Sequence, residues 1–314
     1  MKSITTLLKE GAVLGDSGYL IELERRGYVD SGSRREKVGT GKGSGQFTPE
    51  VAIENPDALR ELHREFLKAG SQVLQALTFF ATRDKLNRAG YGAQTEAINR
   101  AAVRIARETA GDQALVAGSV SRTQLIEREG PGALGHAKDL LAEQIRLLKA
   151  AGVDFLILET FFRLDEMLAA LDAANASGLP AVATLSFRPL ITRCSDDHSP
   201  AECARTLADH GAAAVGANCE QEPARMLPLL REMRQATNIS IAAQPAAFRT
   251  TDQCHCFTRQ PAFPDDLETI QVSRRDFVEF GKIAMAEGIG YVGGCCGCNA
   301  AYIRALADGL GEAK

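Results

Sequence analysis

Eight short apolar segments alternate with amphipathic segments along the chain, and this alternation limits the fold more than any other feature of the sequence. Glycine or polar residues bound most of the apolar segments, and this pattern predicts strands that are buried on both faces. The predicted strands span residues 12–16, 73–78, 114–119, 155–159, 181–186, 214–218, 239–244 and 289–293.

The segments between these strands have helical periodicity. In residues 56–69, for example, Leu59, Leu62 and Phe66 recur at a spacing that builds one apolar helix face. Further helices are predicted over residues 96–110, 135–151, 164–176, 200–210, 223–237, 273–287 and 299–310. Four of these helices are followed by glycines suited to left-handed C-caps, at positions 152, 178, 211 and 288.

Eight strand–helix units in this order predict the α/β class and a single (β/α)8 TIM barrel. A chain of 314 residues is long enough for one such barrel or for two modest domains. Because no linker or internal repeat divides it, we expect one domain over residues 1–314. A doubly wound open sheet has the same local alternation, so periodicity alone leaves it open. Residues 31–47 and 247–272 interrupt the alternation as long loops, which are often functional.

The charge balance and the cysteine content indicate the class of protein. The net charge is -4, so there is no broad basic field and nucleic acid is not an expected partner. No apolar segment is long enough to span a bilayer, and Lys9, Glu10 and Asp16 interrupt the N-terminal segment. We therefore expect no membrane contact and a cytoplasmic location. Thiols stay reduced there, so the eight cysteines point to metal binding or catalysis more than to disulfides.

Polar and sulfur-bearing side chains gather at the ends of the predicted strands. In a TIM barrel the carboxyl ends of the strands form the catalytic mouth. For any one of these residues a cap or a turn is the alternative interpretation, but their convergence on one mouth favours a functional site. The residues concerned are Asp16, Thr78 with Phe79, Glu159, Asn218 with Cys219, Gln244, and Cys295 with Cys296.

The strongest local signal is the motif GGCCG at residues 293–297. Neighbouring residues of a strand point to opposite faces, but the flanking glycines permit backbone angles that let Cys295 and Cys296 face one point. Cys219 ends the sixth strand, which lies near the eighth in a barrel, so the three sulfurs can meet. Three thiolates suit zinc and leave a fourth position open for catalysis. The alternative for the pair is a buried inert couple or a vicinal disulfide.

The remaining cysteines are weaker candidates. Cys298 is a packing thiol, an alternative ligand, or a fourth ligand that would close the site. The Cys254-His255-Cys256 triplet has no second ligand pair at zinc-finger spacing, so we interpret it as part of a loop. We interpret Cys194 and Cys203 as structural.

Taken together, several motifs resemble the homocysteine S-methyltransferase family. The likeness covers nearly the whole chain, in order, and is strongest to the betaine–homocysteine methyltransferase branch. The motifs are GDSGY at 15–19, LHREFLKAGSQVLQALTFFATRDKL at 62–86, DFLILETF at 154–161, GANC at 216–219 and GGCCG at 293–297. The resemblance implies a (β/α)8 barrel with zinc at its C-terminal mouth, held by Cys219, Cys295 and Cys296.

The resemblance also implies an activity. A methyl group would move from an onium donor, either betaine-like or a sulfonium, to the thiol of homocysteine and give methionine. The cofactor would be Zn2+, and the partners would be homocysteine and a small donor. Glu159 and the turn of Asp16, Ser17 and Gly18 would receive the amino-acid end of homocysteine. For Glu159 the alternative is a surface acid at the end of a strand.

The donor side of the expected pocket departs from the betaine-using branch. The chain has no tryptophan, and Phe47 and Phe80 stand where those relatives have Trp and Tyr, while Thr160 replaces another Tyr. Thr78, Phe79 and Phe80 lie at the end of the second strand as expected substrate contacts. Phe47, Phe79, Phe80 and Phe161 are the candidates for contact with an onium cation, with core packing as the alternative for Phe79 and Phe161.

Two further functions stay open at this point. The first is methyl transfer that involves a corrinoid or folate partner. The second is a non-catalytic, thiol-rich zinc-binding or redox-sensing protein. The chain lacks the C-terminal extension through which the betaine enzymes oligomerise. The oligomeric state therefore stays open, and a homo-oligomer is one possibility.

Overall fold

Eight parallel strands form one sheet in this computed structural model, which describes residues 2–29, 49–187 and 192–311. Their order in the sheet is β1-β8-β7-β6-β5-β4-β3-β2. The strands are β1 (Val13–Leu14), β2 (Val73–Ala76), β3 (Leu115–Ser121), β4 (Phe155–Phe161), β5 (Ala181–Leu185), β6 (Ala214–Asn218), β7 (Ser240–Gln244) and β8 (Tyr291–Val292). This sequential order confirms the predicted barrel, because the strand order of a doubly wound sheet reverses.

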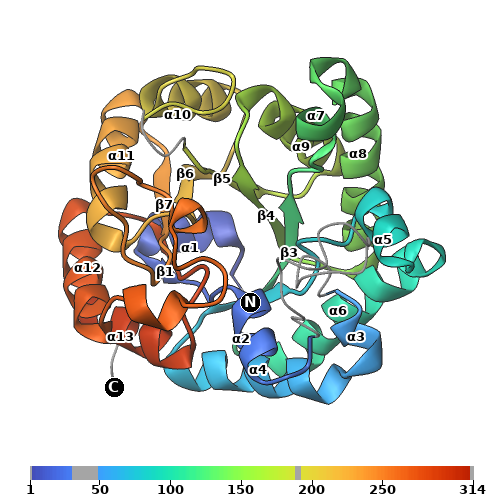
Figure 1. Ribbon diagram of the computed structural model, residues 1–314, viewed down its shortest axis with the longest axis horizontal. Helices are drawn as coiled ribbons and strands as arrows, with labels where there is room; N and C mark the ends of the chain where they lie inside the picture. Colours follow the sequence, from blue (N-terminus) through green and yellow to red (C-terminus); the bar gives the residue numbers. More distant parts are fainter. Residues whose placement is uncertain (1, 30–48, 188–191, 312–314) are drawn as a thin grey trace.

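At the seam between β1 and β2, Gln72 forms two hydrogen bonds with Leu14. The Gln72 amide N–H donates to the Leu14 carbonyl oxygen at 2.7 Å, and the Leu14 N–H donates to Gln72 Oε1 at 2.8 Å. On its other side β1 pairs with β8 through Val13 and Leu14. The first strand therefore bridges the last strand and the second, and the eight strands form a ring (Figure 1).

Helices surround this ring (Figure 1). The α-helices are α1 (Ile4–Glu10), α2 (Tyr19–Arg25), α3 (Val51–Glu54), α4 (Pro56–Ala69), α5 (Arg83–Ala89), α6 (Thr95–Ala110), α7 (Leu125–Glu129), α8 (Leu134–Ala151), α9 (Leu164–Ser177), α10 (Pro200–Asp209), α11 (Pro223–Ala236), α12 (Arg274–Glu287) and α13 (Ala300–Leu310). Short 3-10 helices are η1 (Gly92–Gln94), η2 (Pro131–Ala133), η3 (Phe257–Arg259) and η4 (Leu267–Ile270). The eight predicted helices correspond to α4, α6 and α8 to α13.

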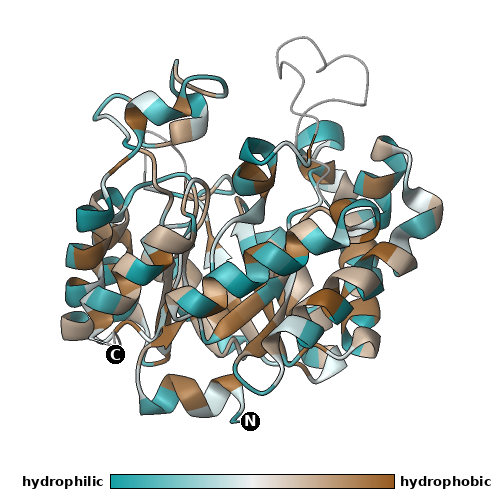
Figure 2. Ribbon diagram, turned by 90° about the horizontal axis from the view of Figure 1, so that it is seen from below, coloured by the Kyte–Doolittle hydropathy of each residue, from teal (hydrophilic) through white to brown (hydrophobic). Residues whose placement is uncertain are grey.

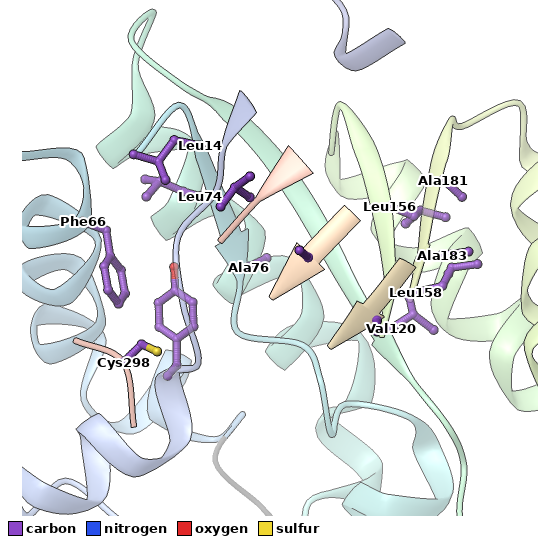
Figure 3. Close-up of a cluster of buried hydrophobic side chains, with 14 of the residues drawn as sticks. Leu14, Phe66, Leu74, Ala76, Val120, Leu156, Leu158, Ala181, Ala183 and Cys298 are labelled. Carbon is purple, nitrogen blue, oxygen red and sulfur yellow. The ribbon is translucent and has the colours of Figure 1, made fainter. Parts of the chain in front are cut away.

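The apolar residues of each strand divide between two cores by side-chain alternation. Leu14 and Leu74 point outward and pack with Phe66 of α4, as Figure 3 shows. Val73 and Phe155 point into the barrel, where they form an inner apolar cluster. Ile4 and Leu8 of α1 belong to the same inner cluster, so α1 closes the N-terminal end of the barrel; Figure 2 shows this helix beneath the strands.

Farther along each strand, the inward-facing positions change from apolar to polar. Val73 of β2 is followed two residues later by Gln75, and Ile157 of β4 by Glu159. Ser119, Thr184, Asn218 and Gln244 occupy the corresponding positions of β3, β5, β6 and β7, and all of these side chains are buried. The barrel thus carries a layer of buried polar groups just below its C-terminal mouth, and buried groups of this kind require hydrogen-bond partners.

Among the described residues, no helix has the length and hydrophobicity needed to cross a membrane.

Candidate metal centre and substrate pocket

Three cysteine thiols converge at the mouth of the barrel. The sulfur atoms of Cys219, Cys295 and Cys296 all lie within 4.8 Å of one another, and those of Cys219 and Cys296 are 3.6 Å apart. A tetrahedral ion with zinc–sulfur bonds of about 2.3 Å places its thiolates about 3.8 Å apart. The three thiols therefore have the separation that a tetrahedral metal requires. No other group of three metal-binding side chains occurs in the described part of the chain.

Cys219 reaches this cluster because the backbone changes direction after β6. Asn218 faces the barrel interior, so continued strand alternation would turn Cys219 outward. Instead Cys219 and Glu220 adopt left-handed φ angles of 60° and 56°. The Cys219 N–H donates to the Gln244 carbonyl oxygen at 2.9 Å, which holds the turn against β7. Non-glycine residues in this conformation carry strain, and such strain concentrates at functional sites.

Cys295 and Cys296 lie in a turn that follows β8, so the strand rule that separates neighbouring side chains does not apply to them. The Cys298 N–H closes this turn on the Cys295 carbonyl oxygen at 3.1 Å. The Cys295 N–H donates to Pro245 at 2.9 Å, and the Cys296 carbonyl accepts from Ala247 at 2.9 Å. Backbone hydrogen bonds to the segment after β7 therefore place both sulfurs.

The turn after β1 packs directly on the cysteine turn. The Ser17 hydroxyl donates to the carbonyl oxygens of Cys295 and Cys298, at 3.0 and 2.9 Å. A Cβ atom at Gly18 would lie 3.0 Å from the Cys295 carbonyl carbon, so only glycine allows this approach without a shift. Ser17 and Gly18, predicted as substrate contacts, line the pocket and also support the cysteines.

The thiols share protons with one another. Hydrogen bonds from Cys219 and Cys295 lower the pKa of Cys296 to about 5, whereas the same thiol contacts raise the pKa of Cys295. The close contact of the three thiols therefore favours the thiolate form at Cys296 and the protonated form at Cys295. A divalent cation replaces these protons and needs all three sulfurs as thiolates, so the donor set fits a soft metal.

Glu159 lies at the end of β4 and lines the same pocket as the three thiols. Burial raises its pKa to about 8, and Ser119 Oγ donates to Glu159 Oε1 at 2.6 Å. The next residue, Thr160, has a left-handed φ of 58°, at a register shift between β4 and β5. Asn218 fixes this bulge, because its side chain accepts from the Thr160 N–H at 2.8 Å and donates to the Thr160 hydroxyl at 2.7 Å.

Asp16 lies beneath the pocket and does not line it. Its side chain is completely buried, and burial raises its pKa to about 7. Oδ2 accepts hydrogen bonds from the Gln75 N–H, at 2.7 Å, and from the Tyr19 hydroxyl. Oδ1 has no hydrogen-bond partner among the described residues. Asp16 and Glu159 thus form a pair of buried carboxyl groups that a cationic ligand group would stabilise in the ionised form.

The end of the pocket away from the thiols is aromatic and basic. Phe79 and Phe80 meet edge to face with their centroids 4.5 Å apart. Lys85 Nζ lies 4.7 Å from the Phe80 centroid, and the Arg122 guanidinium lies 4.1 Å from that of Phe162. All five side chains line the pocket, and the last three were not predicted from the sequence. The signal that could have found Lys85 and Arg122 is a basic residue shortly after each of two predicted strands.

Two predicted substrate contacts lie elsewhere, and one lies outside the described residues. Thr78 is buried, does not line the pocket, and donates its hydroxyl to the Ser119 carbonyl oxygen at 2.7 Å. Phe161 is buried in the outer core, because the bulge at Thr160 changes the strand alternation and brings Phe162 to the pocket instead. Phe47 is outside the described residues.

The other cysteines stand apart from the thiol cluster. The Cys298 thiol donates to the Pro245 carbonyl oxygen at 3.6 Å. The Cys254-His255-Cys256 triplet joins no metal-binding group in the described chain, and its thiols contact backbone carbonyls. The sulfurs of Cys194 and Cys203 form a buried pair 3.8 Å apart.

Comparisons with known proteins identify the family of this chain. The sequence model of the homocysteine S-methyltransferases matches residues 13–310. Betaine–homocysteine S-methyltransferase 1 of Bos taurus is 38% identical over 98% of this chain and 75% of its own length. S-methylmethionine–homocysteine S-methyltransferase of Pongo abelii is 35% identical over 98% of this chain and 81% of its own length.

The fold has a counterpart among solved structures. The metallated form of the homocysteine methyltransferase MmuM from Escherichia coli superposes with a TM-score of 0.71 and 21% identity, over 94% of this chain and 95% of that one. With a family model that matches almost the entire chain and relatives above 30% identity, the assignment is direct: the chain belongs to the homocysteine S-methyltransferase family.

Proposed function

We propose that this chain is a zinc-dependent methyltransferase that moves a methyl group from a small onium donor to the thiol of homocysteine and forms methionine. The observation that carries this proposal is the convergence of Cys219, Cys295 and Cys296 on one wall of a pocket that also contains Glu159. Three protein thiolates leave one position of a tetrahedral metal open to a substrate thiol. Residues 1–314 would act as one homocysteine-binding barrel domain.

Cys219, Cys295 and Cys296 would hold the zinc, which would lower the pKa of a substrate thiol bound beside them and so supply a thiolate nucleophile at neutral pH. The chain's own groups hold the ligands in place for this chemistry. Asn218 Nδ2 points at Cys295 Sγ from 3.9 Å, while the same amide group holds Thr160 at the β4 bulge. Such partners orient metal ligands and set their basicity.

The amino-acid end of homocysteine fits the carboxyl groups at the polar layer. An ammonium group beside Glu159 would favour the ionised carboxylate, offset the cost of burying that charge, and form a charge-assisted hydrogen bond. Asp16, with its unpartnered Oδ1 below the pocket floor, would add to the negative field. The substrate amine would thus be held from below while its thiol reaches the cysteine cluster.

The methyl transfer itself needs a cationic donor. The sulfur of homocysteine forms a bond to the methyl carbon as the carbon–nitrogen or carbon–sulfur bond of the donor breaks, and the electron pair leaves with a neutral amine or sulfide. A thiolate and a cation thereby become neutral products. Phe79 and Phe80 would attract the cation and exclude water, and a water-poor pocket favours a reaction in which charge disappears.

One panel of donors tests this function. The zinc-loaded protein is incubated with homocysteine and, in turn, glycine betaine, dimethylsulfoniopropionate, S-methylmethionine, a methylcorrinoid and a methylfolate, and methionine is measured by mass spectrometry. Methionine from a free onium donor supports the proposal. Methionine from the corrinoid or folate alone would replace it with transfer from such a partner. Zinc binding without methionine from any donor would indicate a non-catalytic metal-binding protein.

A further inference from the structure

The aromatic end of the pocket contains two basic side chains for which the proposed binding of homocysteine has no use. We propose that Lys85 and Arg122 form an anion subsite for the carboxylate of a zwitterionic methyl donor, with the donor's onium group directed toward the thiol cluster. The inference rests on the proposed methyl transfer and adds to it the residues that would bind the donor's carboxylate.

The Lys85 side chain is fully buried, and burial lowers the pKa of its amine well below the ordinary value, while the charges of Glu166 and Glu127 act in the opposite direction. It lies in α5, shortly after the end of β2, and it lines the pocket although its side chain has no exposed surface. Its ammonium donates to the Ser121 hydroxyl at 2.8 Å, and no described carboxylate lies within ion-pair distance of it. Burial of an unpaired charge is unfavourable. The carboxylate of a ligand would supply the missing partner.

Arg122 follows β3 and lines the same pocket. Its guanidinium stacks on Phe162, and Nη1 donates to Glu127 at 2.6 Å. Among the described residues no other acceptor is bound by this guanidinium, so part of its fork of donors is available to a ligand. Burial lowers the pKa of Lys85 most, and the positive charge of Arg122 lowers it further. The two basic groups are therefore close enough to act on one ligand anion.

The two ends of the pocket therefore differ in the sign of their charged groups. Glu159 lines the pocket at the end of β4 together with the thiols, whereas Lys85 and Arg122 line it beside Phe79 and Phe80, after β2 and β3. Burial raises the pKa of Glu220, and the charge of Arg122 acts on that pKa in the opposite direction. A zwitterion is oriented by this arrangement, because its cation is attracted to the acidic end and its carboxylate to the basic end. That orientation brings the methyl groups of the donor toward the thiol cluster.

The carboxylate also removes a repulsion that a simple cation would experience. Lys85 Nζ lies against the rings of Phe80 and Phe79, at 4.7 and 5.7 Å from their centroids. An onium group on the same rings would face this positive charge. A carboxylate bound to Lys85 neutralises it, so the onium can use the rings. Phe80 is half-buried and covers the ammonium, so its ring turns aside when the carboxylate binds.

The test compares two donors and two variants in the zinc-loaded full chain. Dimethylsulfoniopropionate carries a carboxylate, and trimethylsulfonium does not. We expect Lys85→Met and Arg122→Gln each to lower kcat/KM for dimethylsulfoniopropionate by about tenfold to a hundredfold, and to leave kcat/KM for trimethylsulfonium unchanged or higher, because each substitution removes a charge that repels this cation. The control is Arg128→Gln, since Arg128 pairs with Asp84 at 3.0 Å and does not line the pocket; it should leave both donors unaffected.

Calorimetric titration of each donor without homocysteine provides a readout that needs no turnover. Weaker binding of dimethylsulfoniopropionate to the variants, with an unchanged melting temperature, supports the subsite. This holds even if the wild-type protein forms no methionine; in that case the proposed function fails and the subsite stands. Equal losses for both donors, unchanged values in both variants, or no binding of the zwitterion to the wild-type protein would overturn the subsite. If Lys85→Met does not fold, Arg122→Gln decides the question by the same criteria.

Discussion

The thiol end and the aromatic end of the pocket are built by different kinds of contact. At the thiol end, backbone hydrogen bonds from Cys219, Cys295 and Cys296 to neighbouring strand ends place every sulfur. At the aromatic end, Phe79 and Phe80 chiefly contact each other and Lys85 through their side chains. The backbone therefore determines where a metal and a thiol would bind, whereas side chains determine which donor fits, and the two ends should respond separately to substitution.

The backbone conformations differ in the same sense. Thr160, Cys219 and Glu220 all have left-handed φ angles and lie at the ends of β4 and β6. Each such residue costs about 1–3 kcal/mol and persists only where surrounding contacts hold it. The thiol end is therefore strained and pre-organised, which suits a site whose ligands must meet at one point.

The sharpest way to break the comparison is removal of one thiol. Cys219→Ala, Cys295→Ala and Cys296→Ala should each release most of the zinc and lower methyl transfer by about a thousandfold or more, because two thiolates do not complete the site. Metal analysis and methionine formation measure the two effects. Cys194→Ala, which alters the distant cysteine pair, should keep one zinc per chain. Unchanged metal content in all three variants would contradict the assignment.

The buried carboxyl group of Glu159, at the thiol end, should lower the free energy of unfolding as the pH rises. The folded pKa of Glu159 is about 8, above its ordinary 4.5, so the folded chain binds more protons between these values and loses stability as the pH increases through them. In the metal-free protein, Glu159→Gln should remove the Glu159 share of this loss and leave that of Asp16, so it should be more stable than wild type by about 3 kcal/mol at pH 7, with little difference at pH 4. Urea unfolding at pH 4 and pH 7 measures the difference in unfolding free energy between the variant and the wild type. An equal difference at both pH values would show that ionisation of Glu159 is not its cause.

The same substitution should weaken the binding of homocysteine without reducing the zinc content. Glu159→Gln loses a charge-assisted hydrogen bond to the ammonium of homocysteine, so its affinity should fall by roughly 1.5–3 kcal/mol, measured by calorimetry. Zinc content should stay near that of wild type, because Glu159 is not a proposed ligand. Normal homocysteine binding would show that this carboxyl group has another role. Glu129→Gln, on the exposed surface of α7, is the matched control.

At the aromatic end, Phe80→Ala should affect the donor alone. Loss of one cation–π contact of about 0.5–2 kcal/mol predicts an increase in donor KM of roughly twofold to thirtyfold, with little change in the KM of homocysteine. Steady-state kinetics with each substrate varied in turn provides the measurement. A parallel increase in both KM values would mean that the two ends are not independent.

The identity of the donor should follow from the rings present. Phenylalanine is a weaker cation–π partner than tryptophan or tyrosine, and the chain contains no tryptophan. We therefore expect a modest preference for sulfonium donors or bulkier ammonium compounds over glycine betaine, although relatives named for betaine and for S-methylmethionine both match the chain. Comparison of kcat/KM among glycine betaine, dimethylsulfoniopropionate and S-methylmethionine tests this; a clear advantage for glycine betaine would reverse the preference.

The barrel was predictable because its long strands and helices repeat one pattern. The lengths of the first and last strands were overestimated. β1 and β8 contain two residues each, because the chain bends toward the site directly after Leu14 and Val292. Helices α1, α2, α3, α5 and α7 were not predicted. They are seven residues or shorter, so they contain at most two turns of the periodic signal on which the sequence argument depends.

The candidate site shows the same limit at the scale of single residues. The GGCCG motif and Cys219 identified the thiols. The geometry that brings them together is a turn at Cys295 and a left-handed φ angle at Cys219. The left-handed conformation of Cys219 could not be predicted, because no glycine occupies that position. Phe161 was a candidate for contact with the onium group, with core packing as the alternative; the core alternative is correct for Phe161, and the bulge at Thr160 brings Phe162 to the pocket. Lys85 escaped notice because lysine is seldom fully buried.

The bond between Ser17 and Cys295 joins residues 278 positions apart in the chain. The thiol end is thus assembled from the first and last strands of the barrel, and closing so long a loop has to precede any gain from its contacts. A growing polypeptide therefore has no complete metal site until the eighth strand has been synthesised and docked against the first. A metal held by Cys219, Cys295 and Cys296 would therefore find its preformed site only in a chain whose barrel has closed.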